Sequence, residues 1–206
     1  MSGRFRPSGL DNASDGGSKF LGYVPVGITS YEDRADQFDW ADVYIVASLS
    51  LEGSQYPQEM RLAGSFDKEP NGNIKTCTIL KRLYWLFDTI GFDGGPDVQG
   101  KMVDGEGESI DIVSYLNSNH VTSPVDPQHS YLAYLYKEQG RKDPSKTYTT
   151  VFPKLVPNTP AGRKDLEGYI NFMKSKNLIK EVQQGVATNN AVQPNGGIPE
   201  TDNAPF

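Results

Sequence analysis

Apolar and polar residues alternate along three stretches in the first third of the chain, at 20–28, 40–51 and 60–66. Successive side chains of a strand point to opposite faces of a sheet. The alternation therefore predicts three strands, each with one face toward a core. Pro25 favours an edge position or a bulge for the first strand. In the longest strand one face carries Val43, Ile45, Ala47 and Leu49, and the other carries Asp42, Tyr44, Val46, Ser48 and Ser50.

The spacing changes from Thr76 to Ile90, where apolar residues recur every three or four positions. This spacing predicts one apolar stripe on a helix, with Gly91 as its C-terminal cap. A second helix begins at Thr159 and Pro160, a capping residue followed by a first-turn proline. Four side chains lie off the stripe of the first helix and either pack beneath loops or extend a basic, aromatic surface: Lys81, Arg82, Tyr84 and Trp85.

Residues 91–130 are rich in glycine and acidic residues, and a connection of this length is unusual in a compact domain. We therefore expect it to contain ordered structure of its own. Residues 109–116 fit either a short helix or a strand. The acids between Asp93 and Asp111 lack the spacing of an EF-hand loop, which favours a solvated acidic loop over a calcium site.

Residues 131–156 hold two aromatic, β-rich runs around a polar loop, 139–146, that carries three cations. This pattern predicts a strand, a basic loop and a strand. A surface with flat rings beside cations suits an unpaired nucleic-acid strand, because bases stack on rings while phosphates meet Lys and Arg. Alternation alone leaves open which face of the hairpin points outward.

Composition narrows the class of protein. The chain is 36% hydrophobic with 21 Gly and 14 Pro, which favours a β-rich, loop-rich globule. No apolar run approaches the roughly 18 residues of a membrane span, and no signal-peptide core is present, so we expect a soluble, cytoplasmic protein without membrane contact. The single cysteine, Cys77, agrees with a reducing compartment.

Charge is distributed unevenly along the chain. The net charge is −6, yet residues 131–180 carry ten basic and four acidic residues. The basic block thus coincides with the aromatic hairpin, and a local field steers ligands more than the total charge does.

The two ends of the chain differ from the middle in composition. Residues 1–19 and 183–206 are poor in apolar residues, which predicts a flexible arm and a disordered tether around a folded domain at 20–182.

The order strand, strand, strand, helix, strand, strand is that of the OB-fold, a five-stranded Greek-key barrel that commonly binds oligonucleotides. We therefore expect a mainly β protein with such a barrel, with a helix between strands 3 and 4 and a C-terminal helix. The loop 139–146 corresponds to the one joining strands 4 and 5. The tether ends in Glu200, Asp202, Pro205 and Phe206, an acidic spacer before a ring with an α-carboxylate, which a basic pocket with an apolar floor can capture.

The tail GGIPETDNAPF resembles the C-terminal tip of bacterial and phage single-stranded DNA-binding proteins, in which a Gly/Pro/Gln/Asn linker leads to acids and a closing Pro-Phe. The segment YLAYLYKEQGRKDPSKTYTTVFPKL is similar to phage replication proteins of that kind. The resemblance implies a protein that coats unpaired DNA during replication, recombination or repair. It also implies that the tip recruits other proteins, although this tip has only two acids.

This hypothesis needs neither chemistry nor a cofactor, and it leaves the oligomeric state open between monomer and homodimer. Two alternatives remain: a metal-dependent nuclease using the acids of 93–111, and a virion or scaffold protein. The expected stacking rings are Tyr134, Tyr136, Tyr148 and Phe152, with Trp40 and Tyr44 as further candidates. The expected phosphate contacts are Lys137, Arg141, Lys142, Lys146 and Lys154.

Overall fold

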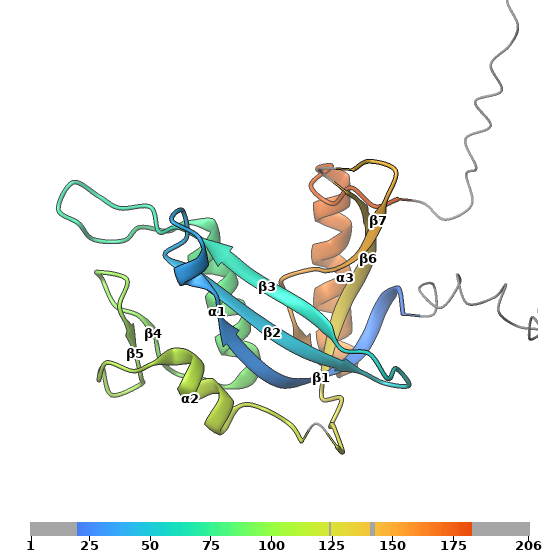
Figure 1. Cartoon of the computed structure of the whole chain (residues 1–206), viewed down its shortest axis with the longest axis horizontal. Helices are drawn as coiled ribbons and strands as arrows, with labels where there is room; N and C mark the ends of the chain where they lie inside the picture. The colour runs from blue at the N-terminus through green and yellow to red at the C-terminus, as the bar shows by residue number, and fades with distance from the viewer. Residues whose placement is uncertain (1–19, 124, 141–142, 183–206) are drawn as a thin grey trace, which may run out of the picture.

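The computed structural model of the chain describes residues 20–123, 125–140 and 143–182, which form a mixed α/β fold (Figure 1). The predicted arm at 1–19 and tether at 183–206 lie outside the described residues. The strands are β1 (Gly22–Asp33), β2 (Val43–Leu51), β3 (Gln58–Gly64), β4 (Gly95–Pro96), β5 (Met102–Val103), β6 (Tyr131–Gln139), β7 (Thr147–Val151) and β8 (Val156–Pro157). The helices are the 3-10 turn η2 (Ala35–Gln37), α1 (Thr78–Ile90), α2 (Ile112–Asn119) and α3 (Pro160–Ser175).

The main sheet is antiparallel, with the order β3-β2-β1-β6-β7, and β8 also pairs with β6. β1 therefore lies in the middle of the sheet and not at the edge that Pro25 favoured. The proline is tolerated because the ladder to β2 starts only at the next residue, where Val26 pairs with Leu51. The register of β1 shifts between Ile28 and Ser30, an irregularity that bends the strand.

The sheet curls so that its two ends, β3 and β7, come close to each other. No ladder joins β3 to β7 in the described part of the chain, so the sheet does not close into the five-stranded barrel that the strand order predicted. A cleft lies between the two strands, lined by side chains of β3, β7 and α1. The structure is thus a curled, open antiparallel sheet.

Helices α1 and α2 cover one face of this sheet. The predicted stripe of α1 is confirmed, and Ile79, Leu83 and Phe87 pack in the larger hydrophobic core. Gly91 caps the helix in the left-handed conformation, with φ 74°, as the sequence predicted. The segment 91–130 holds the small β4–β5 sheet and α2, so the alternatives for 109–116 resolve to a helix that begins at Ile112.

Helix α3 packs on the opposite face, against β6 and β8 (Figure 1). Its predicted start is confirmed, since the Thr159 hydroxyl accepts a hydrogen bond from the Gly162 N–H at 3.1 Å. Leu166 and Ile170 form a second hydrophobic core with residues of β6. Among the described helices, none has the length and apolarity that a bilayer crossing requires.

Two glycines give a matched test of this packing. A Cβ at Gly64 would lie 2.9 Å from the Ile79 Cβ, because α1 crosses β3 closely there. A Cβ at Gly168 in α3 would meet nothing within 4 Å. We expect Gly64→Ala to lower the free energy of unfolding by about 1–3 kcal/mol and Gly168→Ala to raise it by about 0.5–1 kcal/mol. Urea denaturation measures both, and equal effects of the same sign would contradict the close approach of α1 and β3.

Candidate nucleic-acid interface

Three of the rings expected to stack on bases are buried. Tyr134, Tyr136 and Phe152 are 3%, 8% and 5% exposed and belong to the core beneath α3. The apolar stripe of α3 covers the face of the hairpin that carries them, so in this structure they offer no free surface to a base. The face of the hairpin that the sequence left open is thus settled, and these three rings, which we expected to stack on bases, lie on the covered face.

A network of polar contacts holds this cover in place. The Tyr134 hydroxyl donates to the Glu181 carboxylate at 3.1 Å, and Lys174 pairs with the same carboxylate at 2.6 Å. The Lys174 Nζ also lies 4.9 Å from the centroid of the Tyr134 ring. Burial alone would lower the pKa of Lys174, but the contacts with Glu181 and Tyr134 outweigh it and the pKa is raised. The charged form of Lys174 therefore holds α3 against β6.

Lys154 is likewise used within the fold. Its side chain is only 12% exposed and its Nζ lies 2.7 Å from an Asp165 carboxylate oxygen. The same Nζ stands 4.8 Å from the centroid of the Tyr169 ring and 5.7 Å from that of Trp85. Such a cation is already paired, so it is not placed to bind a phosphate as the sequence predicted.

The tip of the β6–β7 hairpin keeps an exposed ring and an exposed cation. Tyr148 is 55% exposed, and Lys146 is exposed although its Nζ lies 3.3 Å from Asp143. A Cβ at Gly140 would lie 2.8 Å from the Tyr148 ring, so only glycine lets the ring rest against the backbone there. Lys137 is half-buried and pairs with Thr149, so it lies on the face of the hairpin opposite to Tyr148. Two expected phosphate contacts, Arg141 and Lys142, lie outside the described residues.

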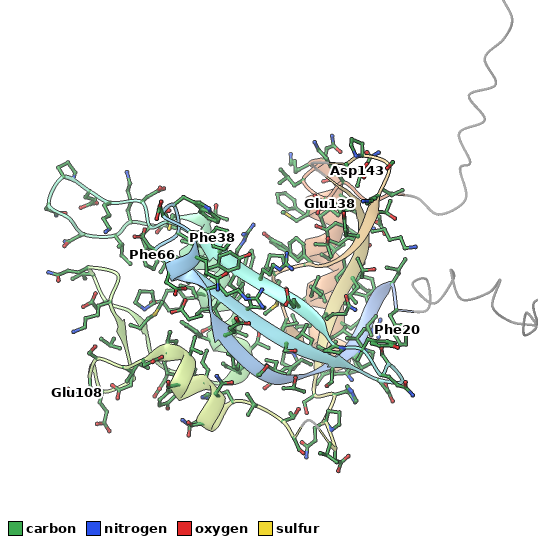
Figure 2. All side chains as sticks on the ribbon, in the orientation of Figure 1. Phe20, Phe38, Phe66, Glu108, Glu138 and Asp143 are labelled. Atoms are coloured by element: carbon green, nitrogen blue, oxygen red, sulfur yellow. The ribbon has the colours of Figure 1, made fainter. Side chains whose placement is uncertain are left out.

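A second group of rings gathers near the start of β2. Trp40 is 56% exposed, and the Phe38 ring stacks on Tyr44 with centroids 4.9 Å apart. Trp40 lies 5.9 Å from Phe38 and 6.3 Å from Tyr44, measured between centroids. Figure 2 shows Phe38 beside the end of β3 and Asp143 at the hairpin tip. Sequence analysis identified Trp40 and Tyr44 as candidate stacking rings but missed Phe38. Its place beside them depends on the turn η2, which ends just before it.

Between these ring groups, the outer side of β2 and β3 carries a network of charges. We call this surface the β2–β3 face: Tyr44, Val46 and Ser48 of β2, and Glu59, Arg61 and Ala63 of β3. Glu59 is held between two cations, 3.1 Å from the Arg34 Nη2 and 2.7 Å from the Arg61 Nη2. Val46, which pairs with Arg61 across the two strands, is 3% exposed although it belongs to neither core.

The β2–β3 face borders the gap between β3 and β7, where a cleft of about 760 Å³ opens. We call it the β3–β7 cleft. Glu59 and Arg61 line its β3 side, and Tyr148 and Thr150 line its β7 side. Arg82 of α1 also lines it, so this residue belongs to the surface and not to the packing beneath loops. In the sequence, the position of Arg82 off the apolar stripe of the helix was the feature that indicated a place at the surface.

The acidic segment forms tight turns. The Asp97 carboxylate accepts hydrogen bonds from the Gln99 and Lys101 N–H groups, and Asp104 accepts from those of Glu106 and Glu108. The backbone hydrogen bond from Lys101 is the largest of the effects that lower the pKa of Asp97. Within the described ranges, no three His, Cys, Asp or Glu side chains gather closely enough to hold a metal ion.

Comparison of the chain with protein-family models, with curated protein sequences and with solved structures finds no match. The function must therefore be inferred from the surface itself.

The charge network on the β2–β3 face gives a pH prediction. The Arg61 hydrogen bond, assisted by Arg34, holds the pKa of Glu59 below its usual 4.5. A carboxyl with a depressed pKa stabilises the fold above its unfolded-state pKa and loses that contribution as pH falls through the folded value. We expect Glu59→Gln to cost about 0.2–1 kcal/mol at pH 7, since the ion pairs are partly exposed.

The cost of Glu59→Gln should disappear in acid. Urea denaturation of both proteins at pH 7 and at a pH below the lowered pKa measures it. Glu106→Gln, in the turn between β5 and α2, is the matched control, because no ion pair of its side chain is present in the described structure. An equal cost of Glu59→Gln at both pH values would show that the carboxylate charge is not what stabilises the face.

Proposed function

We propose that the protein is a sequence-tolerant single-stranded DNA-binding protein. It binds unpaired DNA on the β2–β3 face and the hairpin tip, and it protects that DNA during replication, recombination or repair without chemistry of its own. The observation that carries this proposal is the pair of exposed ring groups, Trp40 with its neighbours and Tyr148, with Arg61 and Arg82 on the surface between them.

The strand order supports the proposal. An OB-fold is a partly open Greek-key barrel that binds oligonucleotides on strands 2 and 3 and on the loop between strands 4 and 5. Here α1 follows β3, and in the proposed correspondence β6 and β7 are the counterparts of strands 4 and 5. The approach of β7 to β3 is the arrangement expected of such a barrel with one open seam. On the proposal that the sheet is such a barrel, the ring groups and arginines correspond to the surface on which OB-folds bind oligonucleotides.

The spacing across β2 and β3 also suits an extended strand of nucleic acid. Tyr44 of β2 pairs with Ala63 and Arg61 of β3 pairs with Val46, so the Tyr44 ring and the Arg61 cation are diagonal neighbours on one face. Such neighbours lie roughly 7–8 Å apart. Every base has a flat face, so stacking on rings tolerates any sequence, while cations meet the phosphates that all nucleotides share. Binding without sequence preference follows from this division.

Removal of the exposed rings tests the proposal directly. Trp40→Ser and Tyr148→Ser should each weaken binding of dye-labelled oligo-dT by about 1–3 kcal/mol, the usual value for one stacked base. Phe172→Ser is the matched control, since Phe172 is an exposed ring on α3. Fluorescence anisotropy of the labelled strand measures affinity. Full affinity after loss of both Trp40 and Tyr148 would refute the proposed surface.

The same titration against salt separates this function from its alternatives. Log affinity should fall with log salt at a slope of roughly −2 to −4, about −0.7 for each of three to five phosphates engaged. A virion or scaffold protein would show no such affinity. A metal-dependent nuclease would shorten the labelled strand in the presence of magnesium, whereas a binding protein leaves it intact.

We further propose that the tip residues Glu200, Asp202, Pro205 and Phe206 recruit replication or recombination proteins. They lie outside the described residues, and the proposal rests on their pattern and on the resemblance. The tip acids would compete with DNA for the same cations. Deletion of 183–206 should therefore raise affinity for oligo-dT at low salt, and Glu200→Gln with Asp202→Asn should do so in part. Unchanged or weaker binding in both variants would contradict this competition.

A further inference from the structure

Arg82 is a half-buried cation that has no acidic partner among the described residues. It lies on α1 and lines the β3–β7 cleft together with Tyr136 and Met173. No carboxylate of the described residues lies within ion-pair distance of its guanidinium. The neighbouring cations differ in this respect, because Arg61 pairs with Glu59 and Lys154 with Asp165.

An unpaired guanidinium in such a place is unfavourable for the fold. Burial disfavours its charge and lowers the pKa of Arg82, although the Tyr169 and Tyr136 side chains act in the opposite direction. Arginine nevertheless stays charged in proteins, so the cost of its partial desolvation is not offset by a salt bridge. The charge therefore points to a ligand.

The cleft has the size and the chemistry for a nucleotide. Its volume of about 760 Å³ lies within the range of roughly 300–1,000 Å³ that is typical of ligand sites. Arg82 lines it together with Tyr148, whose exposed ring can stack on a base. The β3 wall adds Arg61, and the carboxylate of Glu59 is already neutralised by Arg34 and Arg61.

We infer that Arg82 binds a backbone phosphate of a single DNA strand that runs from the β2–β3 face through the β3–β7 cleft to the hairpin tip. The inference rests on the proposed function and deepens it, because it gives the strand a path between β3 and β7 and assigns a residue of α1 to it. The planar guanidinium can donate two parallel hydrogen bonds to a phosphate. Tyr148 stacks on a neighbouring base.

Glu138 shapes the same path. It lines the cleft on β6, and none of the ion pairs in the described structure includes it. A carboxylate beside a bound phosphate repels it, so Glu138 should weaken binding where Arg82 strengthens it. Substitutions of Arg82 and Glu138 should therefore change DNA affinity in opposite directions. A general loss of structure would lower the affinity of both variants.

Four variants test the path by anisotropy of labelled oligo-dT over a range of salt. Arg82→Met should lower affinity roughly 10- to 100-fold, the value of a hydrogen bond to a charged group. It should also make the salt slope less negative by about 0.7, the contribution of one phosphate. Arg82→Lys should keep the slope but lose part of the affinity. Glu138→Gln should bind more tightly, and Arg163→Met, on the first turns of α3 and paired with Glu167, should change neither quantity.

Thermal unfolding of Arg82→Met completes the test. Because the substitution removes a desolvated charge, the Tm should stay the same or rise while DNA binding weakens. A clearly lower Tm would show that Arg82 is structural and would overturn the inference. So would an unchanged affinity and slope in Arg82→Met when the wild type binds oligo-dT, and the proposed function would then stand. If the wild type itself fails to bind at low salt, both fall.

Discussion

The structure depends on the burial of β6 on both of its faces. Ala133 and Leu135 point into the core beneath α1 and α2, whereas Tyr134 and Tyr136 point into the core beneath α3. A strand that is apolar on both sides can only lie between two layers, so α3 has to pack where it does. The two cores meet at β6, and the hairpin it forms with β7 is fixed relative to both.

This burial determines where a ligand can bind. With the middle of the hairpin covered by α3, the exposed rings of the proposed surface are Tyr148 at the hairpin tip and Trp40 before β2, and the surface between them belongs to β3 and the β3–β7 cleft. The missing ladder between β3 and β7 leaves room for this surface, because such a ladder would close the cleft that Arg82 lines. The proposed DNA path thus follows from the incompleteness of the sheet.

Local patterns predicted most of the elements. Alternation located the strands β1 to β3, and Gly91, Thr159 and Pro160 marked helix ends correctly because capping depends on residues close in sequence. The covering of Tyr134 and Tyr136 could not be predicted, since the helix that buries them begins more than twenty residues later. The pairing of Arg34 with Glu59 and the placing of Arg82 also depend on tertiary contacts. Their sequence signals, an arginine after a strand or off a stripe, are common on solvated surfaces.

The two tryptophans of the chain stand in unlike surroundings. Trp40 lies at the surface beside Phe38, whereas Trp85 is half-buried, edge-on to Tyr169 at 5.1 Å and close to the Lys154 cation. Indole emission depends on the polarity around the ring, so the exposed residue should emit at longer wavelength than the enclosed one. The protein therefore carries two intrinsic optical probes, one at the outer surface and one at the junction of α1 and α3.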